Sequence, residues 1–129
     1  EEAEAYCGSD DPAAGLDALA DVCRIAAVKL GRDGAMIREN GQILRVPAER
    51  APRAIDTTGA GDFWAAGFLH GWSQGLGLET AGRFGARLGA QVVQQIGARL
   101  PDAAWQAVRD WMSAELNAGA PAEPSPAAG

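Results

Sequence analysis

The chain has 129 residues and a mass of 13.3 kDa, about the size of one domain. Hydrophobic residues make up 47% of it and charged residues 22%, a balance that excludes disorder over most of the length. No apolar run approaches the ~20 residues that cross a bilayer, and a net charge of −6 argues against binding nucleic acid through a broad basic surface. The acidic start, Glu1 to Glu4, is unlike a secretory signal. We therefore expect a cytoplasmic protein that binds neither membrane nor nucleic acid.

Cysteine and histidine are too scarce for a structural zinc site or a Cys/His nucleophile pair. Cys7 and Cys23 lack a CxxC spacing, and His70 is the only histidine. We expect both cysteines to be reduced, packed thiols, and His70 to be an ordinary packed or half-exposed residue. The basic residues are more unusual, because they comprise ten arginines and a single lysine, Lys29.

The N-terminal part of the chain predicts a helix followed by a strand. Asp11-Pro12 is a typical helix start, and apolar residues then recur at helical spacing: Leu16, Leu19, Ala20 and Cys23. The apolar run 24–30, ended by Gly31, is typical of a buried parallel strand, and we expect it to be central in the sheet.

A β-hairpin is predicted next. Residues 35–39 and 42–46 are β-prone runs that flank Asn40-Gly41. Asn-Gly is favoured in two-residue hairpin turns, because both turn residues need a positive φ. A coil that contains Pro47 and Pro52 follows the hairpin.

The C-terminal half predicts three helices after a polar loop at 56–62. An apolar run at 63–72 indicates a first helix over 60–74. A second helix, from 78 to about 95, carries one apolar stripe: Ala81, Phe84, Leu88, Val92 and Ile96. Pro101-Asp102 opens a third helix, whose buried face consists of Trp105, Val108 and Met112. Residues 117–129 are rich in Ala, Pro, Gly and Ser, which predicts a disordered tail.

These elements leave an α/β domain incomplete. One parallel strand, a hairpin and four helices do not close such a domain, so the chain is interpreted as the second half of something larger. No internal repeat is visible.

Residues 56–62 combine groups that can bind a phosphate. Gly59-Ala60-Gly61 has almost no side-chain bulk, so backbone N–H groups can approach a ligand closely. The following helix directs its positive dipole end at the same place. Asp62 can accept a proton from an attacking hydroxyl beside this anion pocket, and Asp56 can help to organise a cation. The alternative is that Asp62 only caps the helix.

Several segments resemble the PfkB (ribokinase-like) carbohydrate kinases. Residues 56–68, DTTGAGDFWAAGF, resemble the C-terminal signature of that family. Residues 28–31 with Gly34-Ala35 resemble its strand and turn beside the ATP phosphates, and residues 94–98 its late segment near the nucleotide and a monovalent cation. Residues 1–8 resemble its magnesium motif, whose Asn would lie before residue 1. The resemblance covers residues 1–112.

The resemblance implies roles in catalysis and ATP binding. Asp62 would be the catalytic base, and the amides of Gly59, Ala60 and Gly61 would form the anion hole for the transferred phosphoryl group. ATP would contact residues from several segments: Lys29, Gly31, Gly34, Gly61 and Ala86. The alternative for Lys29 is a solvated residue at a strand end. Trp64 and Trp72 are expected to pack in the core behind the site.

The resemblance also implies two metal ions. Glu2 would orient a water on Mg²⁺. A potassium-like ion would bind mostly backbone oxygens at a second site, formed by Asp56, Thr58, Val92, Gln95 and Gly97.

The implied fold is the C-terminal portion of a ribokinase-like three-layer α/β/α domain, over residues 1–116. The implied activity is ATP-dependent transfer of phosphate to a hydroxymethyl group of a sugar or ribonucleoside, as in adenosine-kinase-like or ribokinase-like members. The partner would be that small molecule, and the full-length protein would be a homodimer. The N-terminal substrate half is missing, so we expect no turnover by the chain alone. The alternative is a non-catalytic nucleotide-binding module. A P-loop NTPase is rejected because no GxxxxGK[ST] string occurs.

Overall fold

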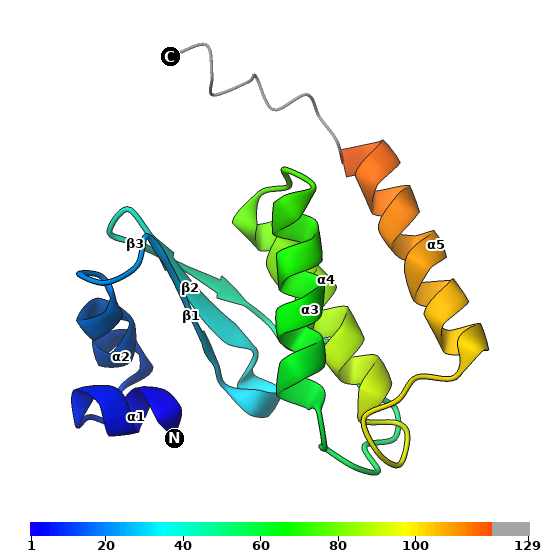
Figure 1. The fold of residues 1–129 in the computed structure, drawn as a ribbon, viewed down its shortest axis with the longest axis horizontal. Helices are drawn as coiled ribbons and strands as arrows, with labels where there is room; N and C mark the ends of the chain where they lie inside the picture. The colour runs from blue at the N-terminus through cyan, green and yellow to red at the C-terminus, as the bar shows by residue number, and fades with distance from the viewer. Residues whose placement is uncertain (120–129) are drawn as a thin grey trace.

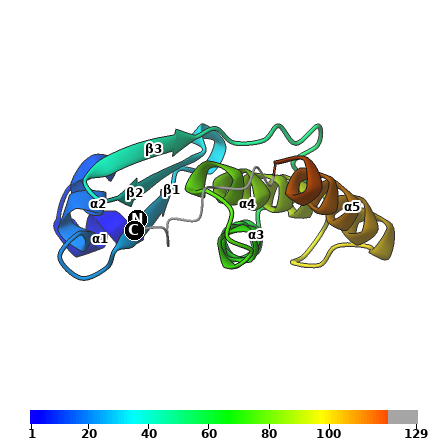
Figure 2. The same ribbon diagram turned by 90° about the horizontal axis from the view of Figure 1, so that it is seen from above.

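A computed structural model describes residues 1–119, which form three layers (Figure 1, Figure 2). The middle layer is a sheet of three strands: β1 (Ile25–Lys29), β2 (Ala35–Glu39) and β3 (Gln42–Val46). Helix α2 (Pro12–Leu19) lies on one face of the sheet with α1 (Glu2–Cys7) beside it. Helices α3 (Ala60–Ser73) and α4 (Leu78–Val92) pack on the other face, and α5 (Asp102–Gly119) lies outside α4. The three-layer α/β prediction is confirmed.

The β2–β3 hairpin forms as predicted. Glu39 pairs with Gln42 at the end of the antiparallel ladder. The intervening Asn40 and Gly41 have φ angles of 51° and 78°. Two consecutive positive φ angles match the right-handed twist of the strands, which is why Asn-Gly suits this turn.

The prediction for residues 24–30 is wrong in two respects. Strand β1 pairs antiparallel with β2, and within residues 1–119 it lies at an edge of the sheet rather than at its centre. The reason is the connection between the strands, a single short 3₁₀ turn, η1 (Gly31–Asp33). So few residues can join only antiparallel neighbours, because a parallel pair needs a crossover of about a dozen residues or more.

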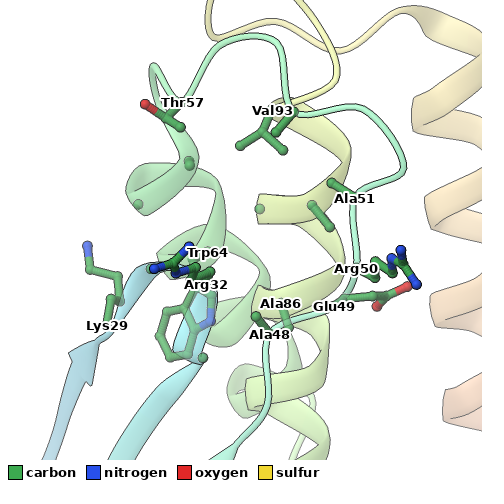
Figure 3. Close-up of a pocket in the computed structure, with 17 residues that line it drawn as sticks. Lys29, Arg32, Ala48, Glu49, Arg50, Ala51, Thr57, Trp64, Ala86 and Val93 are labelled. Carbon is green, nitrogen blue, oxygen red and sulfur yellow. The ribbon is translucent and has the colours of Figure 1, made fainter.

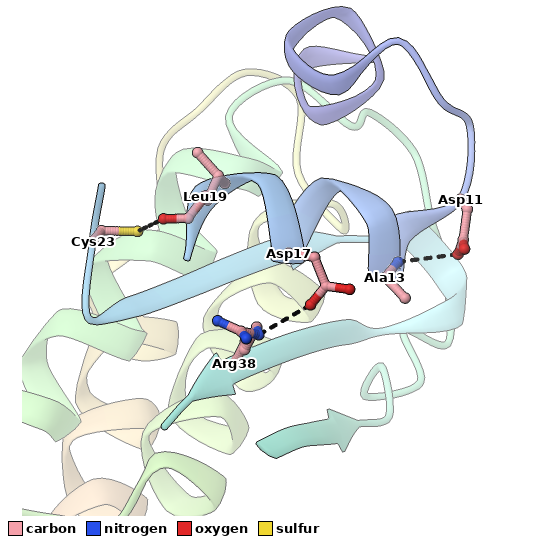
Figure 4. Close-up of polar contacts among 6 residues, drawn as sticks. All are labelled: Asp11, Ala13, Asp17, Leu19, Cys23 and Arg38. Atoms are coloured by element: carbon pink, nitrogen blue, oxygen red, sulfur yellow. Dashed lines mark hydrogen bonds and ion pairs between the residues drawn. The ribbon is translucent and has the colours of Figure 1, made fainter. Parts of the chain in front are cut away.

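Helix α2 begins where predicted and ends earlier. The Asp11 carboxylate accepts a hydrogen bond from the Ala13 N–H at 3.1 Å and caps the helix (Figure 4). An ion pair of 3.2 Å between Arg38 and Asp17 ties α2 to β2. The helix ends at Leu19, so Cys23 is exposed and its thiol donates to the Leu19 carbonyl instead of packing.

Helices α3 and α4 approach each other through glycines. A Cβ on Gly67 of α3 would lie 2.5 Å from the Phe84 carbonyl oxygen. A Cβ on Gly85 of α4 would lie 2.7 Å from the Trp64 carbonyl oxygen. Because any side chain would collide with backbone there, these glycines set the separation of the two helices. Helix α3 covers the predicted range 60–74 to within one residue.

The apolar core has two parts. One part, between the sheet and the α3–α4 pair, contains Ile37, Val46, Phe68 and Ala81. The other lies between α4 and α5 and contains Phe84, Leu88, Val92, Leu100, Val108 and Met112. The predicted buried faces of α4 and α5 are therefore confirmed, with one exception.

Three details at helix ends and surfaces differ from prediction. Helix α4 ends at Val92, so Ile96 leaves the predicted stripe and is 84% exposed. Trp72 is 44% exposed rather than a core residue. Helix α5 extends to Gly119, so residues 117–119 of the predicted tail are helical; residues 120–129 lie outside the described part of the chain.

Over residues 1–119, none of the helices combines the length and apolar character that crossing a membrane requires.

Candidate functional site

A cavity of about 630 Å³ lies where the sheet, the coil after β3 and the α3–α4 pair meet (Figure 3). This volume is within the range of small-molecule sites, which is about 300–1,000 Å³. Its walls come from the end of β1 and the η1 turn, from the coil between residues 48 and 57, and from the two helices. The residues that line it are Lys29, Gly31, Arg32, Gly34, Ala48, Glu49, Arg50, Ala51, Ala54, Thr57, Ala60, Gly61, Trp64, Ala86, Gly89, Ala90 and Val93.

The start of α3 supplies backbone donors to this cavity. Gly59 precedes the helix with φ of 79°, and a Cβ there would lie 2.5 Å from the Ala98 Cβ, so only glycine fits. The Ala60 N–H donates to the Thr57 carbonyl at 3.1 Å. Gly61 and Asp62 follow as second and third residues of the helix, where no preceding turn accepts their N–H groups. This helix end therefore attracts anions.

Lys29 reaches the same helix end from the sheet. It is the last residue of β1, and its side chain extends along the cavity (Figure 3). A Cβ on Gly61 would lie 2.9 Å from Lys29 Nζ, so the ammonium group lies against the Gly61 backbone. The single lysine of the chain and the glycine loop thus form one positively polarised corner.

The charge of the cavity lining is opposite to that of the whole chain. The lining carries three cationic side chains, Lys29, Arg32 and Arg50, and one carboxylate, Glu49. The chain as a whole has a net charge of −6. Glu49 is itself paired with Arg87, at 2.7 Å. The excess of positive charge and the helix end together favour an anionic ligand such as a phosphate chain.

Asp56 fixes the other side of the glycine loop. Its carboxylate accepts hydrogen bonds from the Thr58 hydroxyl at 2.6 Å, the Gly97 N–H at 2.9 Å and the Thr58 N–H at 2.9 Å. These donors lower the pKa of Asp56 from 3.8 to about 2, because they stabilise the ionised form. Asp56 is therefore a carboxylate at neutral pH, held between the loop and the segment after α4.

The structure brings most of the predicted ATP and loop residues together. Six of them line the cavity: Lys29, Gly31, Gly34, Ala60, Gly61 and Ala86. Gly59 directly precedes Ala60 and Asp62 directly follows Gly61, but neither lines the cavity; Asp62 is exposed.

The residues predicted to bind metal ions lie outside the cavity lining. Asp56, Thr58 and Gly97 are linked by hydrogen bonds, whereas Val92 is buried and Gln95 is half-buried near the end of α4. Glu2 is an exposed residue in the first turn of α1. Among residues 1–119, no group of three or more His, Cys, Asp or Glu side chains is arranged to hold a metal ion.

Sequence reasoning missed one wall of the cavity. The coil residues Ala48 to Ala51, with Ala54, line it, and the sequence there predicted only a proline-containing connection. Trp64, expected to be purely a core residue, is half-buried and lines the cavity as well as packing on Phe68 at a ring distance of 5.3 Å. No periodicity or motif marks the coil wall, and although Trp64 lies within the string at 56–68, nothing in that string shows that it lines a cavity.

Comparison with known proteins identifies the family. The profile of the pfkB family carbohydrate kinases, PfkB, matches residues 1–105, so the chain belongs to this family. Its fold is that of the ribokinase-like kinases.

Three similar proteins illustrate the relationship. An uncharacterized sugar kinase of Archaeoglobus fulgidus is 40% identical over 75 residues, which is 58% of this chain and 30% of that protein. The crystal structure of a probable sugar kinase from Rhizobium etli has a TM-score of 0.78 at 38% identity, covering 86% of this chain and 34% of that one. The adenosine kinase from Sinorhizobium meliloti has a TM-score of 0.78 at 36% identity, covering 85% and 34% respectively. The chain thus spans about a third of the length of these relatives.

Proposed function

We propose that this chain forms the ATP side of a kinase that phosphorylates a hydroxymethyl group of a sugar or ribonucleoside. The observation that carries the proposal is the corner where Lys29 lies against Gly61, at the start of α3 and inside a positively charged cavity. Membership in the pfkB carbohydrate kinase family supports the reaction class. The acceptor class follows from relatives described as sugar kinases and an adenosine kinase.

The triphosphate is proposed to lie along the β1–β2 turn and the start of α3. Lys29 and Arg32 would neutralise phosphate charge, and the glycines there would let the backbone approach closely. Free N–H groups at Gly61 and Asp62 would donate to the oxygens of the transferred phosphoryl group. These donors are fixed by the helix, so they stabilise developing charge without reorganising during the reaction.

Asp62 is proposed as the general base. It directly follows Gly61, which is proposed to bind the phosphoryl group, and it is exposed, so an acceptor hydroxyl can reach it. The Asp62 carboxylate would take the hydroxyl proton as the hydroxyl oxygen attacks the γ-phosphorus. The bond from that phosphorus to the β–γ bridging oxygen breaks, and ADP leaves.

The residues of the chain suit the two proposed metal ions to different degrees. Mg²⁺ bound to the nucleotide would neutralise phosphate charge, held chiefly by phosphate oxygens and water, with Glu2 acting only through a water. Asp56 fits a monovalent cation, because its pKa of about 2 keeps it ionised and Oδ2, which accepts one hydrogen bond, retains a lone pair. The Thr58 carbonyl, with backbone oxygens near Val92, Gln95 and Gly97, would complete that site.

The test is the substitution Asp62→Asn, made in the protein expressed from its complete reading frame. Asparagine keeps the size of the side chain and much of its capping ability, so the free energy of unfolding should change by about 1 kcal/mol or less. Loss of the proton acceptor should lower kcat for ATP-dependent phosphorylation by about 10²–10⁴-fold. The affinity for ATP should stay within about twofold, because binding needs no proton transfer.

Asp102→Asn is the matched control. Asp102 is an exposed carboxylate in the first turn of α5, as Asp62 is in the first turn of α3; it lies outside the cavity lining, and the change of charge is the same. Its kcat should stay at the wild-type value. A folded Asp62→Asn protein with near-normal turnover would place the base elsewhere, and one that unfolds would make Asp62 structural.

A further inference from the structure

The coil wall of the cavity, residues 47–54, is held at both ends. At its start, a Cβ on the buried Gly34 would lie 2.8 Å from the Ala48 nitrogen, so the chain packs tightly over that glycine. After its end, the N–H groups of Ile55 and Asp56 both donate to the Val93 carbonyl, at 2.7 and 3.1 Å. Between these points the segment has no helix or strand.

A single polar tie holds the middle of this wall. Over residues 1–119, the only hydrogen bond or ion pair that residues 47–54 make is between Glu49 Oε1 and Arg87 Nη1 of α4, at 2.7 Å. Figure 3 shows the Glu49 side chain leaving the segment on the α5 side, opposite to Lys29. Glu49 therefore contributes to the wall by anchoring it to α4, on the side that faces away from Lys29.

Arg87 is well placed to hold the Glu49 side chain in one position. Its guanidinium carbon lies 4.3 Å from the centre of the Trp111 ring of α5, within the range of a cation–π contact. A planar guanidinium can stack its face on an indole while its edge donates to a carboxylate, which a lysine ammonium cannot do. Both side chains of the Arg87–Glu49 pair are about one-third exposed, at 31% and 33%. Helix α5 thereby fixes Arg87, and Arg87 fixes Glu49.

We propose that Arg87 is a positioning residue that orders the 47–54 wall through Glu49 and thereby raises the affinity of the cavity for nucleotide. The binding part of this inference rests on the proposed function; the ordering part does not. Arg87 itself does not line the cavity. Its effect should therefore fall on nucleotide affinity and leave the chemical step unchanged.

Trypsin measures the ordering directly, because Arg50 and Arg53 lie inside the wall and are exposed. Arg87→Met keeps an apolar stem on Trp111 and removes the charge that holds Glu49. Cleavage after Arg50 and Arg53, followed by mass spectrometry on the full chain, should accelerate by about two- to fivefold, the range expected from losing a partly exposed ion pair. Glu49→Gln replaces one carboxylate oxygen of a partly exposed side chain that belongs to neither core cluster, and it should give the same acceleration.

Arg83→Met is the matched control. Arg83 lies one turn before Arg87 on α4, also near Trp111, and pairs with Glu115 of α5 at 3.3 Å. It makes no contact with the wall, so cleavage after Arg50 and Arg53 should stay at the wild-type rate. The control separates a weakened α4–α5 contact from a released wall.

Calorimetric titration with Mg-ATP measures the binding part. The dissociation constant should rise by about two- to fivefold in Arg87→Met and Glu49→Gln and stay unchanged in Arg83→Met. In the protein from the complete reading frame, KM for ATP should rise with kcat unchanged. Unchanged cleavage in Arg87→Met and Glu49→Gln would overturn the inference, as would faster cleavage with unchanged Mg-ATP affinity. A wild-type chain that binds no Mg-ATP would refute the proposed function and the binding part together, while cleavage would still decide the ordering.

Discussion

At the scale of single residues, Asp56 shows how one carboxylate can fix a loop. Three donors from Thr58 and Gly97 converge on its two oxygens and lower its pKa to about 2. Since the same group in an unfolded chain has a pKa near 3.8, the folded protein binds its proton less tightly. Asp56 therefore contributes stability above about pH 4, and this contribution is lost as the pH falls from about 4 to 2.

The substitution Asp56→Asn tests this linkage. An Asn amide has one acceptor oxygen and turns an NH₂ group toward either Thr58 or Gly97, so the variant should be less stable than the wild type at pH 7. The difference in melting temperature should shrink between pH 4 and pH 2, as the wild-type carboxylate becomes protonated. Thermal melts at a series of pH values measure it. A difference that stayed constant down to pH 2 would contradict the lowered pKa.

The residues of the candidate site were predictable to the extent that their chemistry is local. The glycine loop and Asp62 are adjacent in sequence, so their backbone donors and carboxylate could be inferred from the string itself. The ion pair between Glu49 and Arg87 could not be inferred from the sequence, because these residues are far apart in the chain and meet only through the packing of α4 and α5.

At the scale of helices and strands, the α3–α4 pair depends on glycines at its contact surface. Gly85 illustrates the constraint, because a Cβ there would lie 2.7 Å from the Trp64 carbonyl oxygen and 2.9 Å from its indole ring. Gly89, one turn later on α4, has room, with its nearest neighbour, the Ala60 carbonyl oxygen, at 3.5 Å.

These two glycines give a matched pair of alanine substitutions. Gly85→Ala should lower the free energy of unfolding by about 1–3 kcal/mol, because the helices must move apart to admit the methyl group. Gly89→Ala should leave it unchanged or raise it by up to about 1 kcal/mol, because alanine favours the helix and meets only ordinary contacts. Urea denaturation of both variants measures the difference. If the two variants were equally stable, the backbone contact at Gly85 would not be what sets the distance between α3 and α4.

The same scale shows why some elements were predicted and others were not. The hairpin and the starts of α2 and α3 depend on neighbouring residues, and all three were predicted. The pairing of β1 was predicted wrongly, because the prediction rested on the apolar run and not on the short connection to β2, which allows only an antiparallel pair. Helix α1 was missed because its sequence, EAEAYC, has no apolar stripe; none of its residues is buried.

At the scale of the whole molecule, three segments distant in sequence build one cavity. The β1–β2 turn, the 48–57 coil and the α3–α4 pair each contribute lining residues. Only the complete fold brings Lys29 to Gly61, so a nucleotide bound in the cavity would contact all three segments at once.

Mg-ATP titration followed by backbone amide shifts tests this arrangement. The largest shifts should fall in residues 29–34, 48–54 and 59–61, and they should saturate with one dissociation constant. Mg²⁺ alone, as a control, should leave these three segments largely unshifted. Shifts confined to α5, with none in the glycine loop, would contradict the proposed phosphate position.

The close approach of α3 and α4 has a consequence for how substrate preference can change. The part of the cavity that these helices form consists of one large side chain, Trp64 of α3, and of small residues: Ala60, Gly61, Ala86, Gly89 and Ala90. The small residues expose little beyond peptide groups and methyls, so they offer the same backbone contacts to any phosphate donor. The charged side chains of the lining all come from the end of β1, the turn and the coil: Lys29, Arg32, Glu49 and Arg50. Substitutions in the turn and coil should therefore alter ligand preference while the packing of α3 on α4 stays as it is.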